Sequence, residues 1–407
     1  MPSLLAWLDY SEEDHRRMRE LVALFAQEES RDELGIGAIR DAFSDRLFPG
    51  VSVIQTRARY LLFVPWIYRA AEQRGLTGAQ LRARAEAQER RLVETLRRGG
   101  DLAGLIGRVA GPGVKILPST IYWTGLQTYG IARHPGTFDQ AIRSLVAVRH
   151  LDEADELAER VPSLWHPTLP PAPPGFFDFE SDTFAVQPDE ASFLVERIVD
   201  RVPDSLHAHL LLHRMRLAGD AAAPWLLPTL RQLPEELRGA LEHARLFSLA
   251  MHGAALLYNL LLARRGAELG YDGMDDHADH YEDQLANWWG EVAPDPGVHD
   301  WDRTDFWRTV RASNPNVTPR TVAWVDSWLD GVVGGTAAIA ATDTGLASLV
   351  SDRERRLKGS KSRLVNDRLL AAWNGSAGTA RLLYRWPTVR TQLLDLFDGL
   401  ERHDAGA

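Results

Sequence analysis

The sequence predicts a mainly α-helical protein with many helices, arranged in two or three helical domains with few strands. Apolar residues recur at helical spacing, and convincing alternation of apolar and polar residues is scarce. Capping residues precede many of the apolar stretches, and glycine or proline often follows them. With 407 residues the chain is long enough for more than one domain, because single cores stop growing near about 250–300 residues.

The N-terminal elements follow from these signals in order. Ser11 can cap a first helix, and the acidic residues after it favour the positive helix end. A second helix is expected at 36–47. A third begins near Ser52 and ends at Gly75, with Pro65 expected to kink or divide it. Further expected elements are helices at 78–98, 118–130 and 137–150, with a turn at 111–113.

Residues 165–176 carry five prolines and cannot build a helix, so they predict an extended, semi-rigid linker. This linker divides the chain into an N-terminal helical domain at 1–164 and a central helical domain at 177–330. A basic C-terminal region follows at 331–407.

The central region is again helical, with expected helices beginning at 188, 206, 224, 235 and 319. The most apolar stretch is 246–262. It is shorter than the roughly 20 residues that span a bilayer, and it carries Ser248, His252 and Asn259. We therefore expect a buried core helix and no membrane association.

Composition excludes several chemistries. The chain has no cysteine, so disulfides, thiolate nucleophiles, iron–sulfur clusters and cysteine-bound zinc are impossible. No signal-peptide pattern stands at the N-terminus, and a cytoplasmic location is expected. The phosphate-binding loop, the nucleophile elbow and the helical zinc motif are all absent, and only three lysines are available. These absences leave enzymatic activity open, favour a non-enzymatic protein and predict no cofactor.

Histidines offer two weaker candidates for metal binding. His209 and His213 share a helix face, with His207 nearby, and residues 276–283 combine histidines with carboxylates. A half-buried helix and a solvated acidic face are the simpler explanations of the two patterns, so no metal site is assigned. His252 and Asn259 also share a helix face and form either a polar pair in the core or part of a ligand pocket.

The charge distribution is uneven. The chain carries a net charge of −10, yet residues 351–390 hold ten Lys or Arg against three Asp or Glu, a net +7. Arginine forks suit phosphate oxygens, and Trp373, Tyr384 and Trp386 could stack on bases. The candidate phosphate-binding residues are Arg353, Arg355, Arg356, Lys358, Lys361, Arg363, Arg368, Arg381 and Arg385. Docking of this segment on the acidic remainder of the chain, or a merely solvated face, are the alternatives.

A second group of arginines lies near the start of the third helix. Arg57 and Arg59 cannot share one narrow helix face, so at least one should point inward. A buried arginine requires a carboxylate partner, which the sequence alone does not identify.

Several phrases of the chain resemble a bacterial family of unknown function, and the resemblance covers nearly the whole length. They are SLLAWLDYSEEDHRRMRE, RDELGIGAIRDAFSDRLFPGVSVIQTRARYLLFVPWIY, LPSTIYWTGLQTYGI and RLKGSKSRLVNDRLLAAWNGSAGTARLLYRW. The resemblance implies an association with gene neighbourhoods for defence against phage. It supplies no catalytic residues.

Together these observations predict a non-enzymatic DNA-associated or adaptor subunit of a bacterial anti-phage defence system. Its expected partners are DNA, through the basic segment, and other protein subunits of a defence complex. One alternative is a scaffold that contacts only proteins, for which 13 tryptophans would supply interface anchors. The other is an enzyme with an unrecognised metal-dependent site.

Overall fold

The computed structural model describes residues 32–100, 102–144, 163–176, 184–215, 221–228, 230–335 and 344–406. This part of the chain is all-α: its regular elements are helices, and pairing of extended backbone is limited to one isolated bridge between Ala132 and Trp165. The expected multi-helical fold is confirmed. The described residues form two compact units. Unit 1 lies within Phe48–Asp220 and Arg385–Ala407, and unit 2 within Ala26–Leu47 and Ala221–Tyr384.

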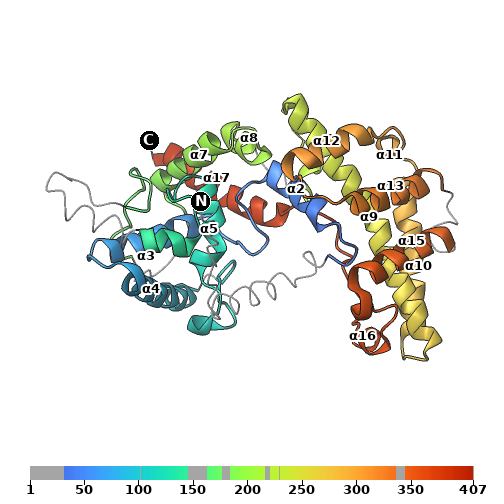
Figure 1. Cartoon of the computed structure of the whole chain (residues 1–407). Coiled ribbons are helices and arrows are strands. Elements are labelled where there is room, and N and C mark those ends of the chain that lie inside the picture. The colour runs from blue at the N-terminus through green and yellow to red at the C-terminus, as the bar shows by residue number, and fades with distance from the viewer. Residues whose placement is uncertain are drawn as a thin grey trace, which may run out of the picture. The chain divides into compact units, whose positions relative to one another are not determined.

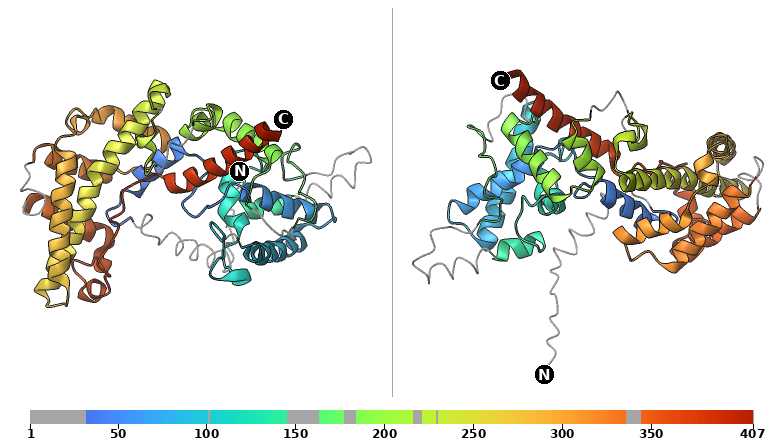
Figure 2. Two further views of the ribbon diagram at one scale, coloured as in Figure 1. Left: turned by 180° about the vertical axis from the view of Figure 1, so that it is seen from behind. Right: turned by 90° about the horizontal axis from the view of Figure 1, so that it is seen from above.

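Unit 1 is built around α3, which packs against α4 and α5 (Figure 1). The C-terminal helix α17 lies beside α7, although the two helices are far apart in sequence (Figure 2). Large aromatic side chains fill the core, where Tyr60 contacts both Tyr122 and Phe184. The helices of unit 1 include α3 (Tyr60–Glu72), α4 (Gly78–Arg98), α5 (Pro118–Thr128), α7 (Pro188–Arg201), α8 (Leu206–Leu212) and α17 (Trp386–Gly406), with the short 3₁₀ helix η2 (Gly111–Gly113).

Two buried or half-buried ion pairs connect the segment before α3 to distant helices of unit 1. Arg59 is buried and donates hydrogen bonds to Glu190 of α7. Arg57 donates through Nε to Asp395 of α17, at 2.9 Å and 3.0 Å from the two carboxylate oxygens. The prediction that at least one of these arginines points inward to a carboxylate is confirmed.

Unit 2 is built on α9, a helix of 34 residues (Figure 1). It turns at 269–273 into α10, and the two helices pack along each other. Helices α2 and α15 also pack on α9. The elements of unit 2 are α2 (Gly37–Leu47), η3 (Pro224–Leu226), η4 (Leu230–Gln232), α9 (Glu235–Glu268), α10 (Met274–Val292), α11 (Pro296–His299), α12 (Arg303–Ser313), α13 (Pro319–Val333), α15 (Thr344–Lys358), η5 (Gly359–Lys361) and α16 (Asp367–Ala371).

Helix α9 contains the apolar stretch that the sequence analysis expected to be a core helix. By length and composition it could cross a membrane, but 83% of its most apolar 18-residue window is buried inside the protein. Tryptophans of two neighbouring helices fix its middle: Trp288 donates to Leu249 O at 2.8 Å and Trp328 to Ala250 O at 3.0 Å. The stretch is therefore buried within unit 2, as expected.

Most expected helices are observed, with two corrections. The third helix begins at Tyr60 and not near Ser52, because the preceding residues form turns held by Tyr122, whose hydroxyl accepts from Thr56 N and donates to Arg57 O. Pro65 does not divide this helix, which continues to Glu72. The helix expected after Ser11 and the end of the one expected at 137–150 lie outside the described residues.

The proline-rich stretch does not coincide with a boundary between the two units, and residues 163–176 belong to unit 1. Its backbone is fixed to α3, because Trp66 Nε1 donates to Pro170 O at 2.8 Å and Arg69 to Leu169 O at 3.2 Å. The ranges 1–164, 177–330 and 331–407 expected from the sequence thus differ from the units that the structure forms. The chain passes between units near Leu47, Asp220 and Tyr384 instead.

Candidate functional site

The basic segment begins on α15, whose apolar residues Leu346 and Val350 are buried within unit 2. Basic residues occupy its last turn, where they complement the negative end of the helix dipole. Gly359, with a φ of +54°, then ends the helix in a left-handed conformation that glycine adopts readily. Asn366 caps α16 by accepting a hydrogen bond from Leu369 N.

Arg353 is an inner residue of this segment, with only 8% of its surface exposed. Its guanidinium donates to Leu34 O at 2.8 Å, Gly35 O at 3.0 Å and Thr321 Oγ1 at 3.0 Å. Burial lowers the pKa of Arg353. We call residues 32–36, which precede α2, the N-terminal strap. Arg353 binds the backbone of this strap and is not available to an external phosphate.

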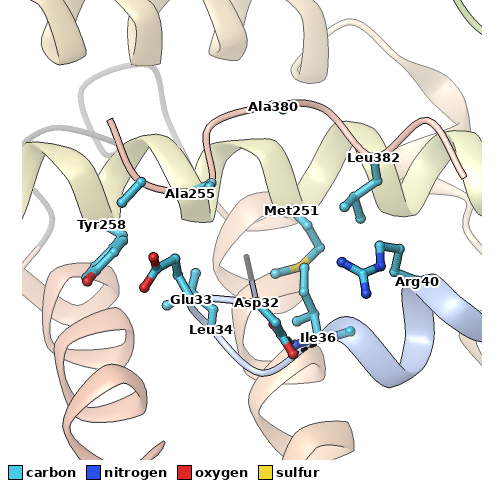
Figure 3. Close-up of a pocket in the computed structure, with 13 residues that line it drawn as sticks. Asp32, Glu33, Leu34, Ile36, Arg40, Met251, Ala255, Tyr258, Ala380 and Leu382 are labelled. Atoms are coloured by element: carbon cyan, nitrogen blue, oxygen red, sulfur yellow. Dashed lines mark hydrogen bonds between the residues drawn. The ribbon is translucent and has the colours of Figure 1, made fainter. Parts of the chain in front are cut away.

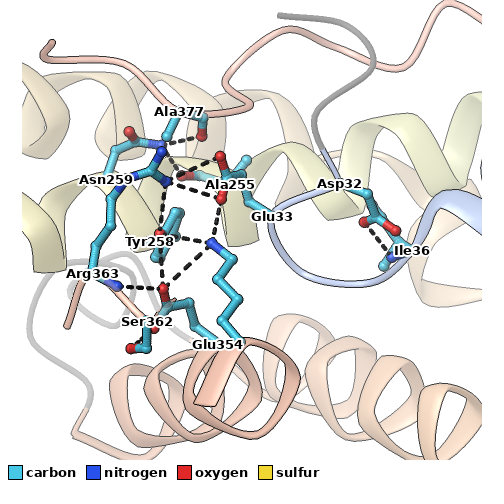
Figure 4. Close-up of polar contacts among 11 residues, drawn as sticks. Asp32, Glu33, Ile36, Ala255, Tyr258, Asn259, Glu354, Ser362, Arg363 and Ala377 are labelled. Atoms are coloured by element: carbon cyan, nitrogen blue, oxygen red, sulfur yellow. Dashed lines mark hydrogen bonds and ion pairs between the residues drawn. The ribbon is translucent and has the colours of Figure 1, made fainter. Parts of the chain in front are cut away.

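Glu33 of the N-terminal strap is the centre of a polar network on α9 (Figure 4). Its carboxylate accepts from Lys358 Nζ and from Arg363 Nη1, the latter at 3.1 Å and 3.0 Å from its two oxygens. Burial acts to raise the pKa of Glu33, but the hydrogen bonds and charges of the two cations outweigh it and hold the pKa below its ordinary value. The pKa of Lys358 shifts in the opposite direction. Burial acts to lower it, but the neighbouring Tyr258 and Glu33 outweigh burial and raise it.

Glu354 lies in the same network and is fully buried. It accepts from Ser362 Oγ, from Arg363 N at 2.9 Å and from Tyr258 OH at 3.3 Å. Lys358 Nζ lies 3.4 Å from its carboxylate. Two carboxylates therefore face two cations, and the network fixes the turn after α15 against α9.

A pocket opens beside this network (Figure 3). It contains about 490 Å³ of space not filled by atoms, part of it open to solvent. Met251, Ala255 and Tyr258 of α9 line one side, while the strap, α2 and residues 377–382 line the others. Figure 3 shows Glu33 and Tyr258 at one end and Arg40 at the other, with apolar side chains and Asp32 between them. The pocket thus has polar groups at both ends and a mainly apolar lining between them that includes one acid.

Side-chain hydrogen bonds to backbone carbonyls hold the 374–378 loop beside this pocket. Asn259 Nδ2 donates to Ala377 O and to Ala255 O, both at 2.8 Å, and Tyr281 OH donates to Gly375 O at 2.6 Å. The expected pairing of Asn259 with His252 is therefore replaced by contacts to backbone carbonyls. The loop supplies one acceptor to Asn259, Ala377 O, that the sequence does not reveal.

The nine candidate phosphate-binding residues fall into separate groups. Arg353, Lys358 and Arg363 are engaged inside unit 2, and Arg381 pairs with Glu291 at 2.5 Å on its surface. Arg385 belongs to unit 1, whereas the other eight belong to unit 2. The remaining four are exposed, and we call them the outer cations: Arg355, Arg356, Lys361 and Arg368.

Carboxylates of the same protein neutralise little of the charge on the outer cations. Arg356 lies 3.8 Å from Asp352, but its side chain is 82% exposed, so this pair contributes little. Within the part of the chain that the structure describes, no ion pair links Arg355, Lys361 or Arg368 to a carboxylate. These four side chains are therefore available to an external anion.

The aromatic residues expected to stack on bases are buried, which corrects that hypothesis. Trp373, Tyr384 and Trp386 are exposed by 5%, 2% and 1%. Trp373 packs against His277 and Tyr384 against Phe43, and the Tyr384 hydroxyl donates to Ala244 O at 2.7 Å. Burying such large apolar rings stabilises the fold more than leaving them in water, so they serve as core residues.

The histidine clusters take structural positions. His207 is fully buried in unit 1, and its Nδ1 lies 3.4 Å from Tyr129 OH. The rings of His209 and His213 are 4.3 Å apart, and burial together with the charge of His213 lowers the pKa of His209. Among the described residues no group of three or more His, Asp or Glu is arranged to hold a metal ion. His277 of the 276–283 stretch packs on Trp373 instead.

Glu33, Tyr258, Glu354 and Ser362 complete the network and were not singled out from the sequence. The spacing of Glu354 and Lys358, four residues apart on one helix, was a usable signal. Glu33 gave none, because it lies 325 residues before Lys358.

The fold and this site define an all-α protein with a charged network and an exposed cationic surface on one helical unit. The chain belongs to a family described as a family of unknown function (DUF6361), whose model matches residues 2–399. No curated protein and no solved structure matches the chain.

Proposed function

We propose that this protein is a cytoplasmic, non-enzymatic adaptor subunit of a bacterial anti-phage defence system, and that its outer cations contact the phosphates of DNA. The observation that carries the proposal is the division of the basic segment. Its inner cations have internal acceptors, whereas Arg355, Arg356, Lys361 and Arg368 are exposed. The resemblance to a family associated with phage-defence gene neighbourhoods supplies the biological setting.

The charge of the chain supports a local contact surface. A net charge of −10 opposes general affinity for nucleic acid, so binding would depend on a few projecting cations. Arginine can donate two parallel hydrogen bonds to a phosphate, and three of the four outer cations are arginines. With Trp373 and Trp386 buried, base stacking from this segment is not expected. The proposed contact is therefore with the backbone and independent of sequence.

The test is a gel-shift titration of duplex DNA at two salt concentrations with the parent and a variant in which all four outer cations are replaced by glutamine. For each phosphate that the variant no longer neutralises, the slope of log affinity against log salt should become shallower by about 0.9. We expect the variant to bind much more weakly at low salt. Unchanged binding would refute the proposed surface.

A matched control separates the surface from total charge. Arg74, Arg84, Arg98 and Arg108 are exposed arginines of unit 1. Replacing these four with glutamine removes the same charge from a different unit. We expect this control to bind DNA as the parent does, within about twofold. An equal decrease in affinity in both variants would show that net charge alone governs binding.

A scaffold that contacts only proteins is the second candidate, and exposed apolar residues favour it. Leu357, Val365 and Leu369 of the basic segment are exposed by 46%, 58% and 38%. Apolar side chains beside cations are common in protein interfaces. Co-purification with a protein partner, combined with no affinity for DNA at low salt, would favour this function over DNA contact.

A further inference from the structure

The carboxylate of Glu33 lies where two cationic donors converge beside the Tyr258 hydroxyl, which itself donates to Glu354. Lys358 Nζ and Arg363 Nη1 both donate to it, and the Tyr258 hydroxyl lies 3.2 Å from Lys358 Nζ and 3.4 Å from Arg363 Nη1 (Figure 4). An ammonium and a guanidinium that donate to one anion are the donor types that recognise phosphate. The geometry therefore resembles an anion-binding site whose present occupant is a side chain of the same protein.

The site is also open to solvent. Glu33 and Tyr258 line the pocket in Figure 3, and the side chains of Lys358 and Arg363 remain 20% and 21% exposed. An anion could approach from the pocket without crossing the core. Asp32, the other acid of the strap, is already engaged, because it accepts from Ile36 N at 2.7 Å and Gly37 N at 2.8 Å.

The charges favour exchange with a phosphate. With Glu33 in place, two carboxylates balance two cations; without it, Lys358 and Arg363 face only Glu354. A phosphate carries more negative charge than a carboxylate and more acceptor oxygens. It can replace the hydrogen bonds of Glu33 and use the freed volume.

We propose that Lys358 and Arg363, held in place by their hydrogen bonds to the Tyr258 hydroxyl, form a phosphate-binding site that Glu33 of the N-terminal strap occupies, so that the strap and a phosphate ligand compete. The site deepens the proposed function and depends on it only for the source of the phosphate, which we take to be DNA. Displacing the strap adds two cations to the outer cations of the same segment.

The first test uses inorganic phosphate as the probe and does not involve DNA. Isothermal titration of Glu33→Ala is expected to show saturable binding that is at least about tenfold tighter than in the parent. The double variant Glu33→Ala with Lys358→Met should lose this gain. A folded Glu33→Ala protein without saturable phosphate binding would overturn the site.

A control and a milder variant keep the test decisive. Asp295→Ala removes another arginine-bound carboxylate of unit 2, one held by Arg245 without the lysine and tyrosine that surround Glu33, so it should gain no phosphate binding. If Glu33→Ala fails to fold by circular dichroism, Glu33→Gln keeps the side-chain volume and removes the charge. It should show a smaller gain, and no gain in Glu33→Gln would also overturn the site.

The source of the phosphate is tested separately, in the background where all four outer cations are glutamine. Adding Glu33→Ala to that background is expected to raise DNA affinity several-fold. Unchanged DNA affinity would overturn DNA as the source. Failure of the proposed function would give a different result: the variant without the outer cations would bind DNA as the parent does. The phosphate titrations do not involve DNA, so they would still test the site by themselves.

Discussion

Arg59 and Glu190 form a bidentate ion pair in the core of unit 1. Arg59 Nε and Nη2 donate to the two carboxylate oxygens at 2.9 Å and 2.8 Å, and both side chains are at most 6% exposed. Glu190 also accepts from Gln187 N at 3.0 Å, which closes the capping box of α7. One carboxylate therefore fixes the start of α7 to the start of α3.

Removing the arginine of this pair should destabilise the protein strongly. Arg59→Met leaves the Glu190 charge buried without its partner, and breaking a buried pair in this way costs about 3–5 kcal/mol. Urea unfolding followed by circular dichroism measures the decrease in stability. Arg356→Met is the control, because its pair with Asp352 is exposed and removing it costs less than about 1 kcal/mol. Similar decreases in both variants would contradict the importance of burial.

The sequence predicted an inward arginine at 57 or 59 but not the partner. That expectation assumed helical spacing, but both residues precede α3, and both pair with a carboxylate. Glu190 lies 131 residues from Arg59, and Asp395 lies 338 residues from Arg57. Such pairs depend on how helices pack, and no short-range pattern encodes that.

The candidate site shows the same limit. Charge counting located the basic segment and its excess of cations. The same count could not separate Lys358, which binds Glu33, from Lys361, which is exposed. Both stand near the C-terminal end of α15, and the positions of the strap and of Glu354 distinguish them.

The buried Glu89 should make the stability of the protein depend on pH near neutrality. It is fully buried and accepts from Ser119 N at 2.7 Å and Tyr68 OH at 3.1 Å. Burial raises the pKa of Glu89 to about 7, above its ordinary value of 4.5. The folded state therefore binds a proton that the unfolded state releases, and this stabilisation is full below pH 4.5 and is lost as the pH rises through 7.

Glu89→Gln should remove this dependence. The amide keeps the volume and one acceptor while eliminating the buried charge, so the variant is expected to be more stable than the parent at pH 8. The gain should be on the order of 3 kcal/mol, the equivalent of the pKa shift. Thermal unfolding at pH 5 and pH 8 measures it. A parent and a variant whose difference does not change between the two pH values would contradict a raised pKa.

The buried His207 should make the stability of the protein depend on pH in the opposite direction. It is fully buried, and burial lowers the pKa of His207 to about 4 from its ordinary value of 6.5. Below pH 6.5 the unfolded chain gains a proton that the folded chain does not, so stability falls as the pH drops towards 4. His207→Leu removes this dependence. Between pH 7.5 and pH 5 the parent should therefore lose about 2 kcal/mol of stability relative to the variant.

The check on His207 is a pair of chemical-denaturation curves at pH 7.5 and pH 5 for parent and variant. His213→Leu is a suitable control, since this histidine is exposed and follows the last residue of α8. We expect the control to follow the parent across the range. If His207→Leu also follows the parent, the buried ring does not govern stability in acid.

Replacing either of two glycines of α9 with alanine should change the stability of the protein, and the two changes should have opposite signs. Gly253 lies beneath Trp288 of α10, and a Cβ built there would stand 2.2 Å from the indole ring. Gly239 is on the same helix, and nothing lies within 4 Å of its Cβ position. Alanine is ordinarily the better helix residue, so Gly239→Ala should stabilise the protein by about 0.4–1 kcal/mol.

Gly253→Ala should instead destabilise by about 1–3 kcal/mol, because the added methyl group forces the indole out of its packed position. The indole cannot yield freely, since its Nε1 donates to Leu249 O at 2.8 Å. Denaturant midpoints of both single variants measure the two signs. In a Trp288→Leu background the penalty at Gly253 should largely vanish, because the clashing ring is gone. A penalty that persists there would place the cause in the helix backbone and refute close packing of α9 on α10 at this glycine.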